Sequence, residues 1–106
     1  MPPSLILGPF HGRPACQSIA FGRGVCGTAA AEKRTVRVED VSEFPGHIAC
    51  DEGSRSEIVV PLLVGGEVVA IIDIDCAVIG GFDEIDEEGL GKLAELLAAS
   101  CDWGPR

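Results

Sequence analysis

Two aspartates lie where a folded protein rarely places carboxylates. Asp73 and Asp75 end a segment, 67–75, that is largely apolar and has the composition of a buried strand. Residues i and i+2 of a strand share one face, so the two carboxylates point the same way. Burial and mutual repulsion both disfavour their ionised forms. The pair therefore predicts a cationic guest or a shared proton, unless this end of the strand emerges into solvent and both groups are simply hydrated.

Glu57 adds a third carboxylate if the two central strands pair with a one-residue shift. Their connection at 65–66 is Gly-Gly, which is typical of a two-residue hairpin loop. An unshifted hairpin places Glu57 opposite Ile74, on the other face from the two aspartates. Pro61 lies between, cannot donate to the ladder and is tolerated at bulges, so we expect a β-bulge near Pro61 if the three carboxylates act together. An ammonium group or a hard cation such as Ca²⁺ or Mg²⁺ would suit such a cluster.

Five cysteines supply a second kind of chemistry. They are Cys16, Cys26, Cys50, Cys76 and Cys101, and none stands in a CxxC pair. An odd count at wide spacing does not suit a secreted disulfide framework or a zinc site. A single cysteine is often no more than a small buried apolar side chain. Several cysteines in polar, glycine-rich segments nevertheless indicate thiol chemistry.

The alternation of apolar and turn residues predicts the elements that must carry these groups. Strands are expected at Leu5–Leu7, Cys16–Phe21, Thr35–Val38, Glu57–Val64 and Glu67–Asp75, and helices at Gly24–Lys33 and Phe82–Cys101. The two long strands are almost continuously apolar, so we expect both of their faces to be covered. A long polar segment, 39–54, precedes them, and loops of this length inside a compact domain are usually functional or mobile.

The C-terminal helix has the clearest local signals. Asp83 is its expected N-cap, and acidic residues fill the first turn. Gly89 and Gly91 weaken it relative to alanine. An apolar stripe is expected to face the sheet, made of Ile85, Leu90, Leu93 and Leu97. These elements predict an α+β domain with a mainly antiparallel sheet and this helix packed on one face.

Length and charge limit the classes of function. The chain has 106 residues, 17 acidic and 8 basic, with a formal net charge of −9, which indicates a single domain over 1–106. The acidic balance argues against nucleic acid and anionic membranes as partners. No apolar run spans a membrane and no signal peptide is evident, so a cytoplasmic protein is expected. The glycines in 22–27 fit GxGxxG, but the segments that follow cannot supply the crossover units of a dinucleotide-binding fold.

Several segments together resemble one family. They are GPFHGRPAC at 8–16, GRGVCGTA at 22–29, GHIACD at 46–51, SEIV at 56–59 and DID at 73–75. These match the pattern of the free methionine-(R)-sulfoxide reductases, which are GAF-domain enzymes, and the cysteine offsets of 10 and 24 fit its three-cysteine pattern. The resemblance extends from about residue 5 to residue 97 and implies a GAF-like fold.

The resemblance implies a role for each matching residue. Cys50 would attack the sulfoxide and become a sulfenic acid, Cys16 would be the main resolving thiol, and Cys26 a second cysteine able to form or relay the disulfide. Thioredoxin or a similar dithiol would regenerate the enzyme, with no metal and no other cofactor. Glu57 is the expected proton donor to the sulfoxide oxygen. The substrate's ammonium would be held by Glu57, Asp73 and Asp75.

The chain also departs from the family pattern. Members ordinarily carry a helix and strand segment, with aromatic pocket residues, before the GPF residues, whereas this chain begins with Met1 just ahead of them. We therefore expect a partial GAF-like domain without that segment, and an unpaired sheet edge that favours a homodimer. The alternative function is a catalytically inactive GAF-type module that binds a small ligand. Cys76 and Cys101 have no place in the pattern; we interpret Cys101 as helix packing and Cys76 as incidental.

Overall fold

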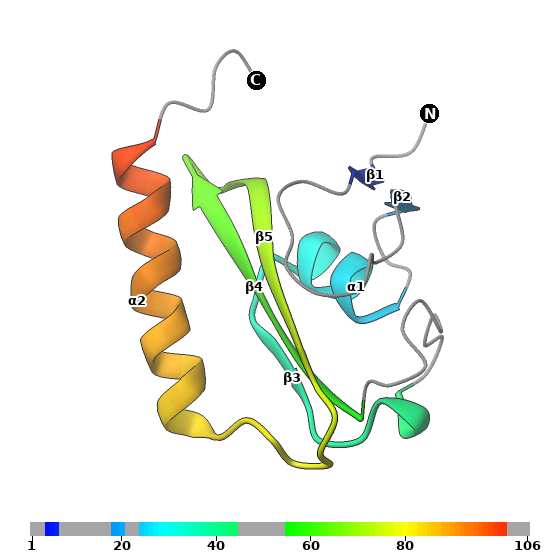
Figure 1. The fold of residues 1–106 in the computed structure, drawn as a ribbon. Helices are drawn as coiled ribbons and strands as arrows, with labels where there is room; N and C mark the ends of the chain where they lie inside the picture. The colour runs from blue at the N-terminus through cyan, green and yellow to red at the C-terminus, as the bar shows by residue number, and fades with distance from the viewer. Residues whose placement is uncertain (1–3, 7–17, 21–23, 45–54, 102–106) are drawn as a thin grey trace.

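The structure, a computed structural model, describes residues 4–6, 18–20, 24–44 and 55–101 (Figure 1). In chain order its elements are β1 (Ser4–Ile6), β2 (Ser18–Ala20), α1 (Gly24–Glu32), β3 (Val36–Val38), a short 3₁₀ turn (Val41–Glu43), β4 (Ser56–Val64), β5 (Glu67–Cys76) and α2 (Glu84–Ser100). β1 pairs with β2, and β3, β4 and β5 form a second sheet in that order, with every pair antiparallel. The expected order of elements and the mainly antiparallel sheet are confirmed.

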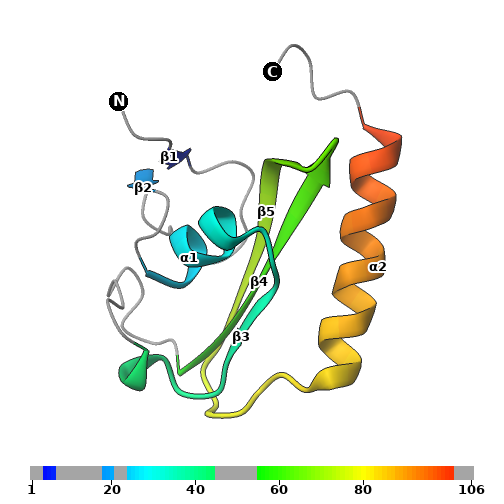
Figure 2. The same cartoon turned by 180° about the vertical axis from the view of Figure 1, so that it is seen from behind.

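The three-stranded sheet lies between the two helices (Figures 1 and 2). Alternate residues of β4 point to opposite faces, as the period of two along a strand requires. Val59 packs in a cluster with residues of α1, whereas Ile58 and Val60 pack in a cluster with residues of α2. Since Glu57 and Val59 are two residues apart, Glu57 lies on the α1 face of the sheet. The alternation along β4 therefore decides which helix each side chain meets.

The hairpin of β4 and β5 has the register shift that would bring the carboxylates together. Leu63 pairs with Val68, but Leu62 pairs with Ala70, so β5 carries one extra residue at this point. This irregularity lies one residue beyond Pro61, which confirms the expected bulge. Beyond it Glu57 pairs with Asp75, not with Ile74. All three carboxylate-bearing residues consequently share the α1 face.

The expectation that both long strands are covered on both faces is confirmed for β4 and wrong for β5. β4 is buried from Ser56 to Leu62, as a central strand should be. β5 is only half-buried in its middle, and its segment 73–75 is exposed. The physical reason is position, because β5 is at the end of the strand order in this sheet. The alternative of a strand end that emerges into solvent therefore describes the exposure of Asp73 and Asp75.

The apolar stripe expected on the C-terminal helix is partly wrong. Ile85 is 79% exposed and Leu93 43% exposed. The face of α2 that packs on the sheet is made of Leu90, Ala94, Leu97 and Ala98, spaced as i, i+4, i+7 and i+8. Ile85 lies on the opposite side of the helix, and Phe82, just before the helix, packs in its place.

Two local devices hold the start of α2. Asp83 is its N-cap, as expected, and completes a reciprocal capping box with Asp86. Arg37 of β3 donates from Nη1 to the carbonyl oxygen of Phe82 at 3.2 Å, and its Nε lies 3.3 Å from Glu87 Oε1. These contacts fix the helix across the face that bears Ile58. The opposite face of the sheet packs against α1 and bears the carboxylates.

Gly89 of α2 offers a direct test of helix propensity at a position that contacts no other side chain. A Cβ built there meets nothing within 4 Å, so Gly89→Ala adds helix propensity without a clash. We expect the free energy of unfolding to rise by about 0.5–1 kcal/mol, measured by urea denaturation. Gly81→Ala is the matched control with the opposite sign, because its Cβ would lie 2.5 Å from Cys76 Sγ. A gain in stability for Gly81→Ala would contradict this close packing.

Candidate active site

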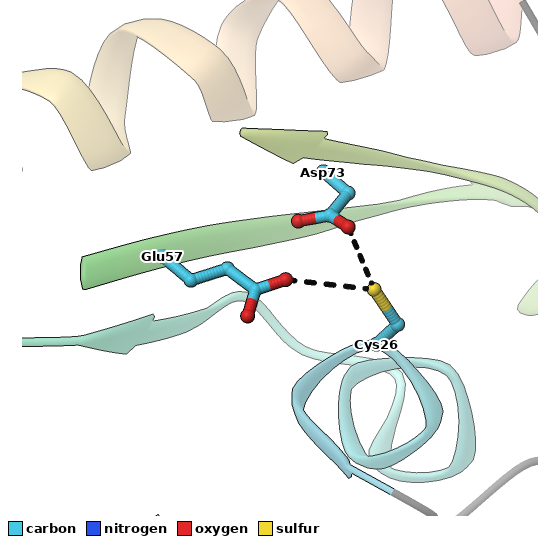
Figure 3. Close-up of side chains that lie close together, drawn as sticks. All are labelled: Cys26, Glu57 and Asp73. Carbon is cyan, nitrogen blue, oxygen red and sulfur yellow. Dashed lines mark hydrogen bonds between the residues drawn. The ribbon is translucent and has the colours of Figure 1, made fainter. Parts of the chain in front are cut away.

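A thiol and two carboxylates meet between α1 and the sheet (Figure 3). Cys26 Sγ lies 3.0 Å from Asp73 Oδ2 and 3.7 Å from Glu57 Oε2. Cys26 comes from α1, Glu57 from the central strand β4 and Asp73 from β5. The three side chains point toward one another from three different elements. We call Cys26, Glu57 and Asp73 the thiol–carboxylate cluster.

α1 places Cys26 over the sheet because the helix is made of small residues. Its sequence GVCGTAAAE carries three alanines, the best helix formers, and no side chain bulkier than valine on its buried part. Val25 and Ala29 are almost fully buried and pack in the cluster that contains Val59. This close packing brings the backbone of α1 near the strand, so the short side chain of Cys26 reaches the carboxylates.

Glu57 is the buried acid of the cluster. It is 8% exposed, and the ion pairs formed within 24–44 and 55–101 involve other carboxylates. Burial raises the pKa of Glu57 to about 10, with further contributions from a hydrogen bond to Asp73 and the charges of Asp73 and Asp75. Glu57 is therefore a neutral carboxylic acid at pH 7, with a proton to donate. Its hydrogen bond with Cys26 acts in the opposite direction and is the smallest contribution.

Cys26 is held as a protonated thiol. Burial is the largest cause that raises its pKa far above the ordinary value, followed by the charge of Asp73 and the hydrogen bond to it, and then by Glu57. The S–H proton donates to Asp73 Oδ2, the nearer of the two oxygens. Because the thiolate is the nucleophilic form, Cys26 in this state is a poor nucleophile.

Several predicted site residues are brought together and others are not described. Cys26, Glu57 and Asp73 meet directly, and Asp75 pairs with Glu57 across the strands and raises its pKa. The sequence did not reveal that Cys26 touches the carboxylates, since its place was assigned by the cysteine pattern alone. Cys16 and Cys50 lie outside the described residues.

The two cysteines without a predicted role differ from one another. Cys101 is exposed just after α2, so its interpretation as helix packing is wrong: its backbone N–H bonds to the carbonyl of Leu97 while its side chain faces solvent. Cys76 is half-buried at the end of β5 and packs against Gly81. Neither cysteine belongs to the thiol–carboxylate cluster.

The helices that the structure describes include none with both the length and the apolar character that crossing a membrane requires.

Comparison with known proteins gives one consistent family. The sequence profile of the GAF domain matches residues 5–100. The chain is 57% identical over 92% of its length to the free methionine-R-sulfoxide reductase of Saccharomyces cerevisiae, and 52% identical over 94% of its length to that of Escherichia coli. A free methionine-R-sulfoxide reductase from Neisseria meningitidis, solved in complex with its substrate, superposes with a TM-score of 0.88 at 50% identity over 91% of this chain.

These relatives are longer than this chain. The matched region spans 55% of the yeast protein, 62% of the Escherichia coli protein and 57% of the Neisseria chain.

Proposed function

The chain belongs to the GAF domain family, and from this premise we propose that it reduces free methionine (R)-sulfoxide to methionine by thiol chemistry. The observation that carries the proposal is the thiol–carboxylate cluster of Cys26, Glu57 and Asp73 (Figure 3). A buried protonated acid beside an exposed carboxylate suits a guest with both a cationic end and an oxygen to be protonated. Free methionine sulfoxide has an ammonium group and a sulfoxide oxygen.

The carboxylates divide these two tasks by their exposure. Asp73 and Asp75 are exposed at the end of β5, where a solvated ammonium can enter and exchange water for charge-assisted hydrogen bonds. Glu57 is buried and neutral, so it donates its proton to the oxygen. A peptide-bound methionine sulfoxide has an uncharged amide in place of the ammonium. The cluster would thus select the free amino acid.

The proposed reaction transfers one oxygen atom to a thiol. Cys50 Sγ attacks the sulfoxide sulfur and forms a sulfur–sulfur bond to it. The oxygen then passes to Cys50 as that bond and the sulfur–oxygen bond of the substrate break, so Cys50 becomes a sulfenic acid and methionine leaves. Two electrons pass from the sulfur of Cys50 to the sulfur of methionine. Glu57 protonates the departing oxygen, and the proton given up by the Cys50 thiol restores Glu57.

Regeneration needs a second thiol and an external reductant. The thiol of Cys16 attacks the Cys50 sulfenic acid, which forms a disulfide and releases water. Thioredoxin or a similar dithiol then supplies two electrons and two protons by thiol–disulfide exchange, as in a reducing, cytoplasmic setting. Cys26 is the second cysteine able to relay this disulfide, and its protonated state supports a role after the chemical step, not in it. The reaction uses no metal and no other cofactor.

Asp73→Asn should weaken substrate binding more than it slows chemistry. Removal of one charge-assisted contact to the ammonium costs about 1.5–3 kcal/mol, so we expect KM for free methionine (R)-sulfoxide to rise about 10- to 100-fold with a smaller change in kcat. Steady-state kinetics with a dithiol reductant measure both constants. Glu95→Gln, which removes an exposed acid of α2, is the matched control and should leave KM unchanged. An unchanged KM in Asp73→Asn would contradict the ammonium role.

A stereospecific assay tests the proposed function as a whole. The full chain is supplied with free methionine (R)-sulfoxide, with the (S) epimer, or with the N-acetylated (R) form, in the presence of dithiothreitol or thioredoxin. We expect turnover of the first compound only. Turnover of the N-acetyl form at the same rate would contradict the proposal that the carboxylates bind the substrate's ammonium group. Turnover of none of the three compounds would contradict the proposal that the chain is an enzyme.

A second candidate is a GAF-type module that binds a small amino-acid-like ligand without turnover. It is favoured by one observation, that the thiol of the cluster, Cys26, is protonated and so is a poor nucleophile. Isothermal titration with methionine sulfoxide distinguishes the two candidates. Binding by a chain that shows no turnover in the assay above supports the module.

A further inference from the structure

We propose that Cys26, Glu57 and Asp73 also form a binding site for a divalent cation of the Zn²⁺ class. The three ligand atoms, one sulfur and two carboxylate oxygens, all lie within 4.8 Å of one another. In a tetrahedral zinc site, a Zn–S distance of about 2.3 Å and a Zn–O distance of about 2.1 Å place sulfur and oxygen about 3.6 Å apart. The distance of 3.7 Å from Cys26 Sγ to Glu57 Oε2 is close to this value, and the distance of 3.0 Å to Asp73 Oδ2 is shorter because a hydrogen bond joins these two atoms. Small side-chain movements would complete the geometry.

The donor set selects the class of metal. Mg²⁺ and Ca²⁺ require six or more oxygen ligands, and a thiol does not serve them. A thiolate with two carboxylates suits a borderline ion such as Zn²⁺, or the softer Cd²⁺. The hard cation considered from the carboxylates alone is therefore the poorer fit, because Cys26 and not another oxygen completes the cluster.

None of the described ion pairs places a basic side chain against the thiol–carboxylate cluster. Glu57 is only 8% exposed, and the described ion pairs of Arg34, Arg37 and Lys92 are made with Glu32, Glu87 and Glu88 instead. A divalent ion would supply the positive charge that stabilises the carboxylate of Asp73 and, once their protons are released, the thiolate of Cys26 and the carboxylate of Glu57. Asp73 is exposed, so the ion and a water as its fourth ligand can arrive from that side. On binding, the S–H proton of Cys26 and the carboxyl proton of Glu57 both pass to solvent, so binding should strengthen as the pH rises.

Binding of such an ion would inhibit the proposed reaction. The ion would occupy the place of the substrate's ammonium at Asp73, would take the proton-donating position at Glu57, and would withdraw Cys26 from disulfide relay. This consequence rests on the proposed function, whereas the binding itself does not.

The test is a titration of the reduced full chain with Cd²⁺, followed by the ultraviolet absorption of the cadmium–thiolate bond, and with Zn²⁺ by calorimetry. We expect Cys26→Ser, Glu57→Gln and Asp73→Asn each to weaken the affinity at least about tenfold. Cys101→Ser removes an exposed thiol outside the cluster and should change nothing. Ca²⁺ should bind at least about 100-fold more weakly than Zn²⁺.

Two results would overturn the inference: an affinity for Cd²⁺ that Cys26→Ser does not change, or Ca²⁺ binding as tight as that of Zn²⁺. Circular dichroism checks that each variant is folded, and if Cys26→Ser is not, Asp73→Asn decides, because Asp73 is exposed and does not support the core. The titration involves no turnover. Its failure is therefore distinguishable from a failure of the sulfoxide assay.

Discussion

Cys50→Ser is expected to lower turnover of free methionine (R)-sulfoxide at least about a thousandfold, because a serine hydroxyl cannot take the oxygen atom from the substrate. Cys26 is the alternative nucleophile, but its thiol is buried, protonated and bonded to Asp73. Single-turnover assays without added reductant measure the chemical step alone. In that assay Cys26→Ser should keep its rate within about tenfold of the parent chain, since serine can also donate to Asp73.

The full comparison uses a third thiol as its reference. Cys101 is exposed and outside the cluster, so Cys101→Ser should have the parent rate in both single-turnover and steady-state assays. Cys16→Ser should keep the first turnover and lose later ones when thioredoxin is the reductant. If Cys26→Ser loses the first turnover while Cys50→Ser keeps it, Cys26 is the nucleophile and the assignment is wrong.

The local pattern of the sequence limited the arrangement of Glu57, Asp73 and Asp75 to two alternatives but did not decide between them. Period-two alternation, the Gly-Gly connection at 65–66 and Pro61 are features of neighbouring residues, and together they require either separate carboxylates or a bulge. The structure contains the bulge, so Glu57 faces the same side as Asp73 and Asp75. The cap at Asp83, in contrast, was predicted outright, because a helix N-terminus is specified by neighbouring residues and its capping box is contained within four of them.

The position of Cys26 could not be predicted from spacing. It is 31 residues from Glu57 and 47 residues from Asp73, and their contact depends on which face of the sheet α1 covers. The packing face of α2 was misjudged for a related reason. Its apolar residues form more than one stripe, and the surface of the sheet decides which stripe is buried, so Ile85 lies in solvent. Long-range packing fixed both outcomes.

Glu57→Gln is expected to lower kcat about 100- to 10 000-fold, the usual effect of removing a general acid. The amide has nearly the shape of the protonated carboxyl and can still donate a hydrogen bond to Cys26 or Asp73, but it cannot release a proton to the sulfoxide oxygen. KM should change less than kcat, because Asp73 still holds the ammonium. A variant that keeps kcat and loses only KM would move Glu57 from proton donor to ammonium ligand.

The same substitution should stabilise the fold at neutral pH. The pKa of Glu57 is about 10 in the native chain against an ordinary value of 4.5, so the native state keeps a proton that the unfolded state releases. The stability that Glu57 contributes is fully present below pH 4.5 and is lost as the pH rises toward 10. The substituted amide does not titrate, so the two chains should differ little at pH 5. At pH 8 we expect Glu57→Gln to be more stable by about 1–3 kcal/mol, after discount for relaxation of the native site.

Urea denaturation at pH 5, 6.5 and 8 measures this divergence. The range avoids the acid limb, where Asp40 and Asp83 titrate: hydrogen bonds with Ser42 lower the pKa of Asp40, and the backbone of Asp86 lowers that of Asp83. Those two carboxyls act with the opposite sign, since their stabilisation is lost as the pH falls. A constant difference between Glu57→Gln and the parent chain would show that Glu57 is ionised in the native state. A carboxylate there could not protonate the sulfoxide. The loss of kcat and the pH-dependent gain in stability of Glu57→Gln are therefore expected together, because both require a protonated Glu57.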